Sequence, residues 1–179
     1  VGALAATVLL LGANAFFVAV EFALVASRRT KLESMAEAGQ AGAKRALVSI
    51  ADLSSQLAGA QLGITIASLL LGYVAEPAIA HALEAVLHDV VDLPETVTAT
   101  IGFAVGLTIV VFLHMVLGEM VPKNIAIAGP EKTLLALDLP NRAYLWMFGP
   151  VITVLNALAN VIVRLLGFEP ADELSNSHT

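Results

Sequence analysis

The apolar residues of this 179-residue chain are gathered in long, nearly unbroken blocks. Val1 to Ser27 contains one acid and no basic residue, and Val97 to Leu117 contains one titratable group, His114. A helix rises about 1.5 Å per residue, so about 20 such residues cross the roughly 30 Å hydrocarbon core of a bilayer. The chain is 58% hydrophobic and only 13% charged, well beyond the composition of a soluble domain. We therefore predict an all-α integral membrane protein.

Two further apolar regions are less uniform. The block from about Leu53 to Val74 contains three glycines and several polar residues, so we expect an interrupted helix. From Glu76 to Glu95 there are acids and histidines without Lys or Arg, and we expect a polar loop holding one short helix. The last region, Leu139 to Gly167, has a Gly-Pro pair in its middle and aromatic and basic residues near its ends. These features favour a belt helix along the inner membrane surface over a fourth crossing.

The basic residues orient the predicted spans. Five lie between the first and second blocks: Arg28, Arg29, Lys31, Lys44 and Arg45. None lies between the second and third blocks, and Lys123, Lys132 and Arg142 follow the third. The positive-inside rule therefore predicts an N-terminus outside and a C-terminus in the cytoplasm. The expected architecture is three transmembrane helices, a juxtamembrane belt helix and short cytoplasmic helices.

Composition and motifs exclude several functions. The absence of cysteine rules out disulfides and thiolate metal sites. A net charge of -6 with only 9 Lys and Arg argues against a broad nucleic-acid surface. The sequence has no Gly-x-Ser-x-Gly, no phosphate-binding loop and no His-Glu-x-x-His. We therefore predict that the chain is not an enzyme.

Polar residues inside the apolar blocks are the candidate functional groups, because such groups are costly in hydrocarbon and usually face a bundle interior or a wet cavity. The candidates are Asn14, Glu21, Gln61, Thr65, Ser68, Thr108, His114 and Glu119. Glu21 and Glu119 are both expected in the cytoplasmic half of their helices. If those helices are adjacent, both acids face one cavity that opens to the cytoplasm. The hydroxyl residues are equally typical of groups that join two helices.

A predicted helix break surrounds Glu119. Pro122 has no N–H and its ring clashes with the carbonyl of Gly118, four residues earlier, so this carbonyl is expected to be free to bind a cation. Mg²⁺ prefers oxygen ligands and takes few of them directly from a protein. The backbone at Gly63 is a candidate on the same argument, although glycines also permit close helix packing.

His114 is expected to play an accessory role, together with Asn14 and Ser68. In an α-helix the separation of five positions from His114 to Glu119 amounts to about one and a half turns, so the two side chains need not share a face. We expect His114 to be a buried, hydrogen-bonded histidine rather than a metal ligand.

Three segments, one in each predicted span, together resemble one family. They are Asn14 to Val25 (NAFFVAVEFALV), Ala60 to Thr65 (AQLGIT) and Leu113 to Lys123 (LHMVLGEMVPK). On these segments the chain resembles the CNNM/CorC (DUF21) transmembrane domain, in its hemolysin-like bacterial branch. The resemblance implies a homodimer in the bacterial inner membrane, with a cytoplasm-facing Mg²⁺ cavity. It also implies that residues 1–168 form the transmembrane domain and that residues 169–179 lead to the cytoplasmic CBS domains of a longer protein.

The resemblance places the family's ion-binding acid on Glu119. Other expected ligand positions depart from the family pattern. Many members have serines just before and a threonine just after the acid of the first span, where this chain has Val18, Val20 and Phe22. In the second span, Ala60-Gln61 stands where many members have an Asn-Asn pair. Glu21, Gln61 and Thr65 replace the missing ligands, or the ion is held more weakly, or the substrate differs. The predicted metal-site residues are Glu119, Glu21, Gln61, Thr65, Gly63 and Gly118.

The leading hypothesis is a membrane transporter that exports Mg²⁺ as its substrate, without a resident cofactor and with Na⁺ as the coupling ion proposed for the family. One alternative is export of a polyamine or another organic cation, which a cavity with two acids would also suit. Another is a membrane scaffold that senses an ion without transporting it.

Overall fold

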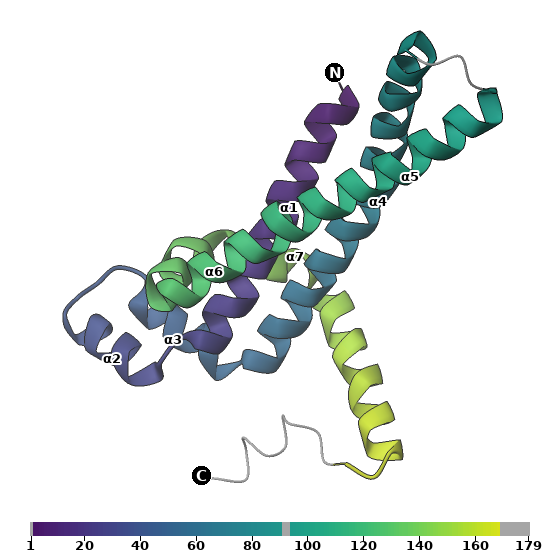
Figure 1. The fold of residues 1–179 in the computed structure, drawn as a ribbon. Coiled ribbons are helices and arrows are strands. Elements are labelled where there is room, and N and C mark those ends of the chain that lie inside the picture. The colour runs from purple at the N-terminus through teal and green to yellow at the C-terminus, as the bar shows by residue number, and fades with distance from the viewer. Residues whose placement is uncertain (1, 91–93, 169–179) are drawn as a thin grey trace. The chain divides into compact units, whose positions relative to one another are not determined.

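The computed structural model describes residues 2–90 and 94–168, and the predicted tail at 169–179 lies outside them (Figure 1). Over the described residues every regular element is a helix, which confirms the all-α prediction. The elements are α1 (Gly2–Ala26), α2 (Arg29–Glu37), α3 (Ala43–Ala51), α4 (Leu53–Val90), α5 (Glu95–Leu113), the π-helical turn η1 (His114–Met120), α6 (Val121–Ala128) and α7 (Pro130–Leu165).

Four helical stretches are long and apolar enough to cross a membrane. They are Gly2–Ala26, Leu53–Ala80, Thr96–Ala128 and Pro130–Leu165. The first three agree with the predicted spans. The fourth contains the region predicted as a belt helix, so length and composition do not distinguish a belt from a fourth crossing.

The second predicted span differs from expectation. α4 is one helix from Leu53 to Val90, so both the expected interruption and the expected loop after Glu76 are wrong. The segment after Pro77 is rich in Ala and Leu, which are strong helix formers, and prolines are tolerated within apolar helices. The acids and glycines of this segment are therefore accommodated within one continuous helix.

The chain divides into two compact units. The first unit comprises Val1–Val18 and Gly63–Asn124, and the second comprises Ala19–Leu62 and Ile125–Thr179. Helices α1 and α4 each contribute to both units. The candidate cation site lies in the first unit.

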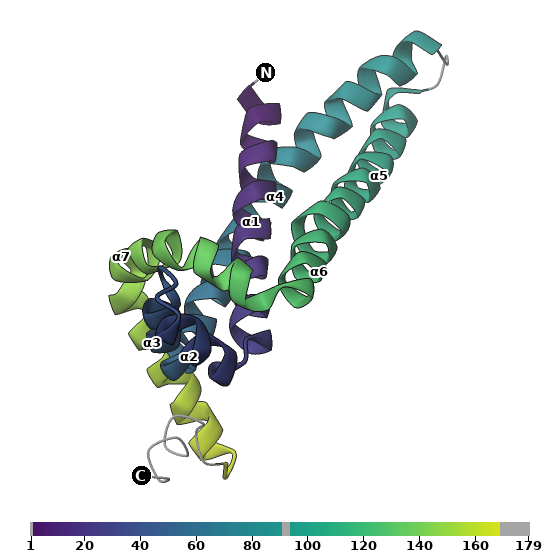
Figure 2. The ribbon, with the colours of Figure 1, turned by 90° about the vertical axis from the view of Figure 1, so that its left-hand side faces the viewer.

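The first unit is built on close packing of α1, α4 and α5. Its core consists of Leu71, Ala75 and Val110, against which Leu10, Leu11 and Ile79 pack. Figure 2 shows the later part of α4 beside α5. The two helices approach so closely that a Cβ added to Gly106 would lie 3.1 Å from the backbone nitrogen of Ala80.

The second unit joins α2 and α3 to α7. Gly39 and Gly42 adopt positive φ angles of 74° and 86° in the α2–α3 turn, the break that their sequence position predicts. α7 buries a polar stripe, Glu131, Asp138 and Asn141, each only 1% exposed. Lys31 Nζ lies 2.8 Å from a Glu131 carboxylate oxygen.

α7 also exposes large apolar side chains and changes direction along its length (Figures 1 and 2). Pro140 and Pro150 lie inside it and account for the bending, because proline interrupts the helical hydrogen bonds. A helix that is polar toward its own unit and apolar outward is suited to contact with lipid.

Candidate cation site at a π-helical turn

The site forms where the third predicted span stops being an α-helix. Residues His114–Met120 form the π-helical turn η1, in which each carbonyl accepts from the N–H five residues later. Pro122 follows in α6 and has no N–H, so neither the π-type partner of Leu117 nor the α-type partner of Gly118 can come from it. The predicted helix break is therefore present, as a widened turn rather than an end. Such turns are frequent at functional sites.

Asn14 of α1 satisfies the carbonyl that this break releases. Its amide Nδ2 donates to the Gly118 carbonyl oxygen at 2.9 Å, and its side chain is fully buried. The carbonyl therefore accepts this side-chain hydrogen bond, and because a carbonyl oxygen has two lone pairs, its role as a cation ligand stays a prediction. A Cβ at Gly118 would lie 3.1 Å from Asn14 Nδ2 and 2.8 Å from His114 Cδ2, so the residue must be small.

A chain of hydrogen bonds continues from Asn14 to His114. Ser68 Oγ donates to Asn14 Oδ1 at 3.0 Å and lies 3.2 Å from His114 Nε2. Because the Gly118 carbonyl only accepts, the Asn14 amide must point its nitrogen there and its oxygen toward Ser68. The single hydroxyl hydrogen of Ser68 is then used in the bond to Asn14 Oδ1, so in the contact with His114 the imidazole Nε2 must donate to Ser68 Oγ. The network assigns a proton to that nitrogen.

His114 and Glu119 come together, contrary to expectation. His114 Nε2 lies 3.6 Å from Glu119 Oε1. The prediction assumed 3.6 residues per turn, whereas a π-helical turn is wider, and its i→i+5 hydrogen bonds bring positions i and i+5 close together. The Glu119 side chain is 41% exposed and that of His114 is 22% exposed, so the carboxylate is accessible from outside the network.

The other predicted site residues occupy different places. Thr65 lies in the first unit and is exposed, whereas Gly63 is buried. A Cβ at Gly63 would lie 2.5 Å from the Phe17 ring, so this glycine allows α1 and α4 to pack closely. Glu21 and Gln61 belong to the second unit. The predicted meeting of Glu21 with Glu119 stays a prediction.

The charge of the cluster is low. Over the part of the chain that the structure describes, no three His, Asp or Glu residues gather as a metal-binding group. Glu119 is thus accompanied by one histidine and by neutral oxygens from Asn14, Ser68 and Gly118. This arrangement differs from a closed zinc site and suits a hydrated cation that takes few protein ligands.

The predicted site was incomplete in one respect. Asn14, Ser68 and His114 were only accessory candidates, yet these three side chains form the connected network beside Glu119. Their common signal is a polar residue in each of three apolar blocks. The sequence did not show which of these side chains contact one another, because their contacts depend on the geometry of the π-helical turn.

Apolar helices of spanning length and a polar, acid-bearing turn within one of them define a multi-pass membrane protein. The chain belongs to the family of the Cyclin M (CNNM) transmembrane N-terminal domain, whose family model matches residues 5–179. This confirms the resemblance found in the sequence. The family is associated with membrane metal-ion transport.

Individual relatives agree with this assignment. The chain is 48% identical over 166 residues to an uncharacterized protein of Mycobacterium tuberculosis, covering 93% of this chain and 47% of that protein. It is 37% identical over 170 residues to the UPF0053 protein YhdT of Bacillus subtilis, covering 95% of this chain and 37% of that protein. The UPF0053 protein YugS of the same organism is 36% identical over 170 residues, covering 95% of this chain and 39% of that protein. The chain thus spans about half the length, or less, of these relatives.

Proposed function

We propose that the chain is the membrane domain of a Mg²⁺ exporter in which Glu119 is the principal ligand. The observation that carries the proposal is the π-helical turn, which places this accessible carboxylate beside a buried network of neutral polar groups. The family's association with membrane metal-ion transport supports the same conclusion.

The chemistry of the cluster favours a small, hard cation. Asn14 Oδ1, Ser68 Oγ and the Gly118 carbonyl are oxygen ligands of the type that Mg²⁺ accepts, and one carboxylate suits an ion that keeps several of its waters. In the structure Ser68 Oγ donates to Asn14 Oδ1, Asn14 Nδ2 donates to the Gly118 carbonyl, and His114 lies against Glu119. An arriving cation would compete with His114 for the Glu119 carboxylate.

The proposed ligand set extends beyond the cluster. Glu21, Gln61 and Thr65 remain proposed oxygen donors, because acids and amides in apolar helices usually serve a cavity. Gly63 fits less well as a backbone ligand, since α4 continues through it and its carbonyl belongs to the helical hydrogen-bond ladder. We further propose Na⁺-coupled export by a homodimer in the bacterial inner membrane, with CBS domains following the described chain.

The test is calorimetric titration of Mg²⁺ into the purified 179-residue protein, with and without Na⁺. Glu119→Gln should abolish saturable binding, because it removes the accessible carboxylate with little change of shape. Glu37→Gln in α2, an exposed acid outside both the cluster and the proposed set, makes the same chemical change and should leave binding intact. Competition by Na⁺ would support exchange, and equal binding by the parent and Glu119→Gln would overturn the proposed site.

The alternatives give different results in the same preparation. A polyamine exporter would show heat with cadaverine but none with Mg²⁺. A sensing scaffold would bind Mg²⁺, yet Mg²⁺ flux through vesicles containing the protein, with its cytoplasmic domains attached, would be unaffected by Glu119→Gln.

A further inference from the structure

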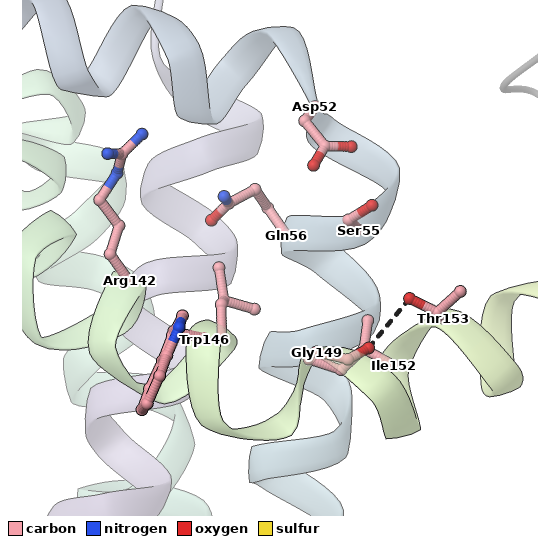
Figure 3. Close-up of a pocket in the computed structure, with 9 residues that line it drawn as sticks. Asp52, Ser55, Gln56, Arg142, Trp146, Gly149, Ile152 and Thr153 are labelled. Carbon is pink, nitrogen blue, oxygen red and sulfur yellow. Dashed lines mark hydrogen bonds between the residues drawn. The ribbon is translucent and has the colours of Figure 1, made fainter.

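A second polar site lies in the second unit, between the first turn of α4 and the middle of α7 (Figure 3). The pocket has a volume of about 370 Å³, within the roughly 300–1,000 Å³ typical of small-molecule sites. Its chemistry comes mainly from Asp52, Gln56, Arg142 and Trp146. It shares no residue with the candidate cation site.

One side of the pocket offers hydrogen-bond donors. Gln56 is only 7% exposed, and its Oε1 accepts from Asn141 Nδ2 at 2.9 Å. Among the described residues the Gln56 side chain hydrogen-bonds only to Asn141, so its amide nitrogen keeps its N–H groups for a ligand. The Arg142 guanidinium lies on the same side, and its buried Nε has no hydrogen-bond partner in the described structure.

The surrounding charges leave this side positive. Asp138 Oδ2 lies 3.6 Å from Arg142 Nε and 3.5 Å from Arg45 Nε. A single buried carboxylate therefore faces two guanidinium groups. The residual positive charge favours an anion, and a phosphate matches the planar fork of arginine well.

Asp52 gives the pocket an opposite charge on its other side. It precedes α4 and is exposed, and Figure 3 shows its carboxylate across Gln56 from the Arg142 guanidinium. The two lining groups thus suit a ligand that carries both a phosphate and a protonated amine.

The residues around the pocket are typical of the membrane–water interface. The candidate membrane span of α4 begins at Leu53, so Asp52 and Gln56 flank its first turn. Trp146 lines the pocket and is 86% exposed, and tryptophan is enriched at the membrane–water interface. Exposed Val151 and Leu155 continue along α7 and provide apolar contact for acyl chains.

We propose that this pocket binds the headgroup of a phosphatidylethanolamine lipid. The phosphate accepts hydrogen bonds from Arg142 and Gln56, and the primary ammonium pairs with Asp52. Phosphatidylglycerol lacks the amine and meets the Asp52 charge unfavourably. Phosphatidylcholine has a quaternary ammonium without N–H groups and cannot donate a hydrogen bond to Asp52.

Trp146 is the only tryptophan of the chain and reports directly on the pocket. We would reconstitute the protein in phosphatidylcholine vesicles and add lipids with brominated acyl chains near the headgroup, which quench tryptophan fluorescence. Brominated phosphatidylethanolamine should quench Trp146 at lower mole fractions than the matched phosphatidylglycerol or phosphatidylcholine. Equal quenching by all three lipids would overturn the proposal.

Two variants test the two halves of the site. Arg142→Gln should weaken quenching by phosphatidylethanolamine about ten-fold, as expected for loss of a charge-assisted hydrogen bond. Asp52→Asn should instead abolish the preference for phosphatidylethanolamine over phosphatidylglycerol. Asp52 is exposed, so this second variant keeps the test valid if Arg142→Gln, which also removes a neighbour of Asp138, fails to fold.

The matched control is Arg164→Gln, which makes the same change on α7 outside the pocket and should alter nothing. Soluble glycerophosphoethanolamine separates a lipid site from a site for the free headgroup. Much weaker competition by this compound than by the lipid supports the proposal, whereas equal potency would overturn the assignment to a lipid. Unchanged selectivity in Asp52→Asn would likewise overturn it.

Discussion

Gly118 is the residue at which backbone shape and side-chain contact are most closely coupled. A methyl group there would meet His114 at 2.8 Å and Asn14 at 3.1 Å. We expect Gly118→Ala to destabilise the protein by about 1–3 kcal/mol, because overpacking forces neighbouring groups to shift. Thermal unfolding followed by circular dichroism measures this directly.

The control for Gly118→Ala is Gly12→Ala. Gly12 lies in α1 with nothing within 4 Å of its added Cβ, so alanine should leave stability unchanged or raise it by about 0.5–1 kcal/mol. Equal unfolding temperatures for Gly118→Ala and the parent would mean that the close approach at the π-turn is not needed for stability.

Among the helices, α1 and α4 pack through a glycine and an aromatic ring. A Cβ on Gly63 would lie 2.5 Å from the Phe17 ring. We expect Gly63→Ala to cost about 1–3 kcal/mol of stability and the added change Phe17→Leu to recover part of it. Gly72→Ala on the same helix, where nothing lies within 4 Å, should be harmless in the same unfolding assay. A double variant no more stable than Gly63→Ala alone would contradict this pairing.

The π-helical turn is the second element with a testable cause. Pro122→Ala restores a backbone N–H that can donate a hydrogen bond to the Gly118 carbonyl. The turn should then relax toward an α-helix, which would separate His114 from Glu119. We expect no loss of thermal stability but clearly weaker Mg²⁺ binding in the calorimetric titration. Pro150→Ala, which removes a proline inside α7, should not change Mg²⁺ binding. Undiminished Mg²⁺ affinity in Pro122→Ala would separate the site from the π-turn.

The helical elements were largely predictable, whereas the internal order of the site was not. Hydrophobic block length identified the spanning helices, and Gly39 and Gly42 identified the α2–α3 turn. The continuity of α4 was missed, because local helix propensity and packing outweigh scattered glycines and acids. The contact of His114 with Glu119 was missed for another reason. It depends on a non-α repeat, and no α-helical periodicity reveals that repeat.

At the scale of the whole molecule, α7 buries polar side chains and exposes apolar ones, and this distribution bears on membrane topology. Its first half buries Glu131, Asp138 and Asn141 within the second unit, together with the basic α2–α3 segment. Buried carboxylates and their basic partners are costly near the bilayer centre and are accommodated at the interface. This favours a belt at the membrane interface over a fourth crossing.

Because the chain has no cysteine, single cysteines report topology without background. We expect Thr96→Cys to react with an impermeant maleimide outside intact cells, and Ser34→Cys and Leu166→Cys to react only after permeabilisation. All three positions are exposed in the structure, so protection reports the membrane rather than the fold. Outside labelling at Leu166 would mean that α7 crosses the membrane, and outside labelling at Ser34 would reverse the orientation that the basic residues predict.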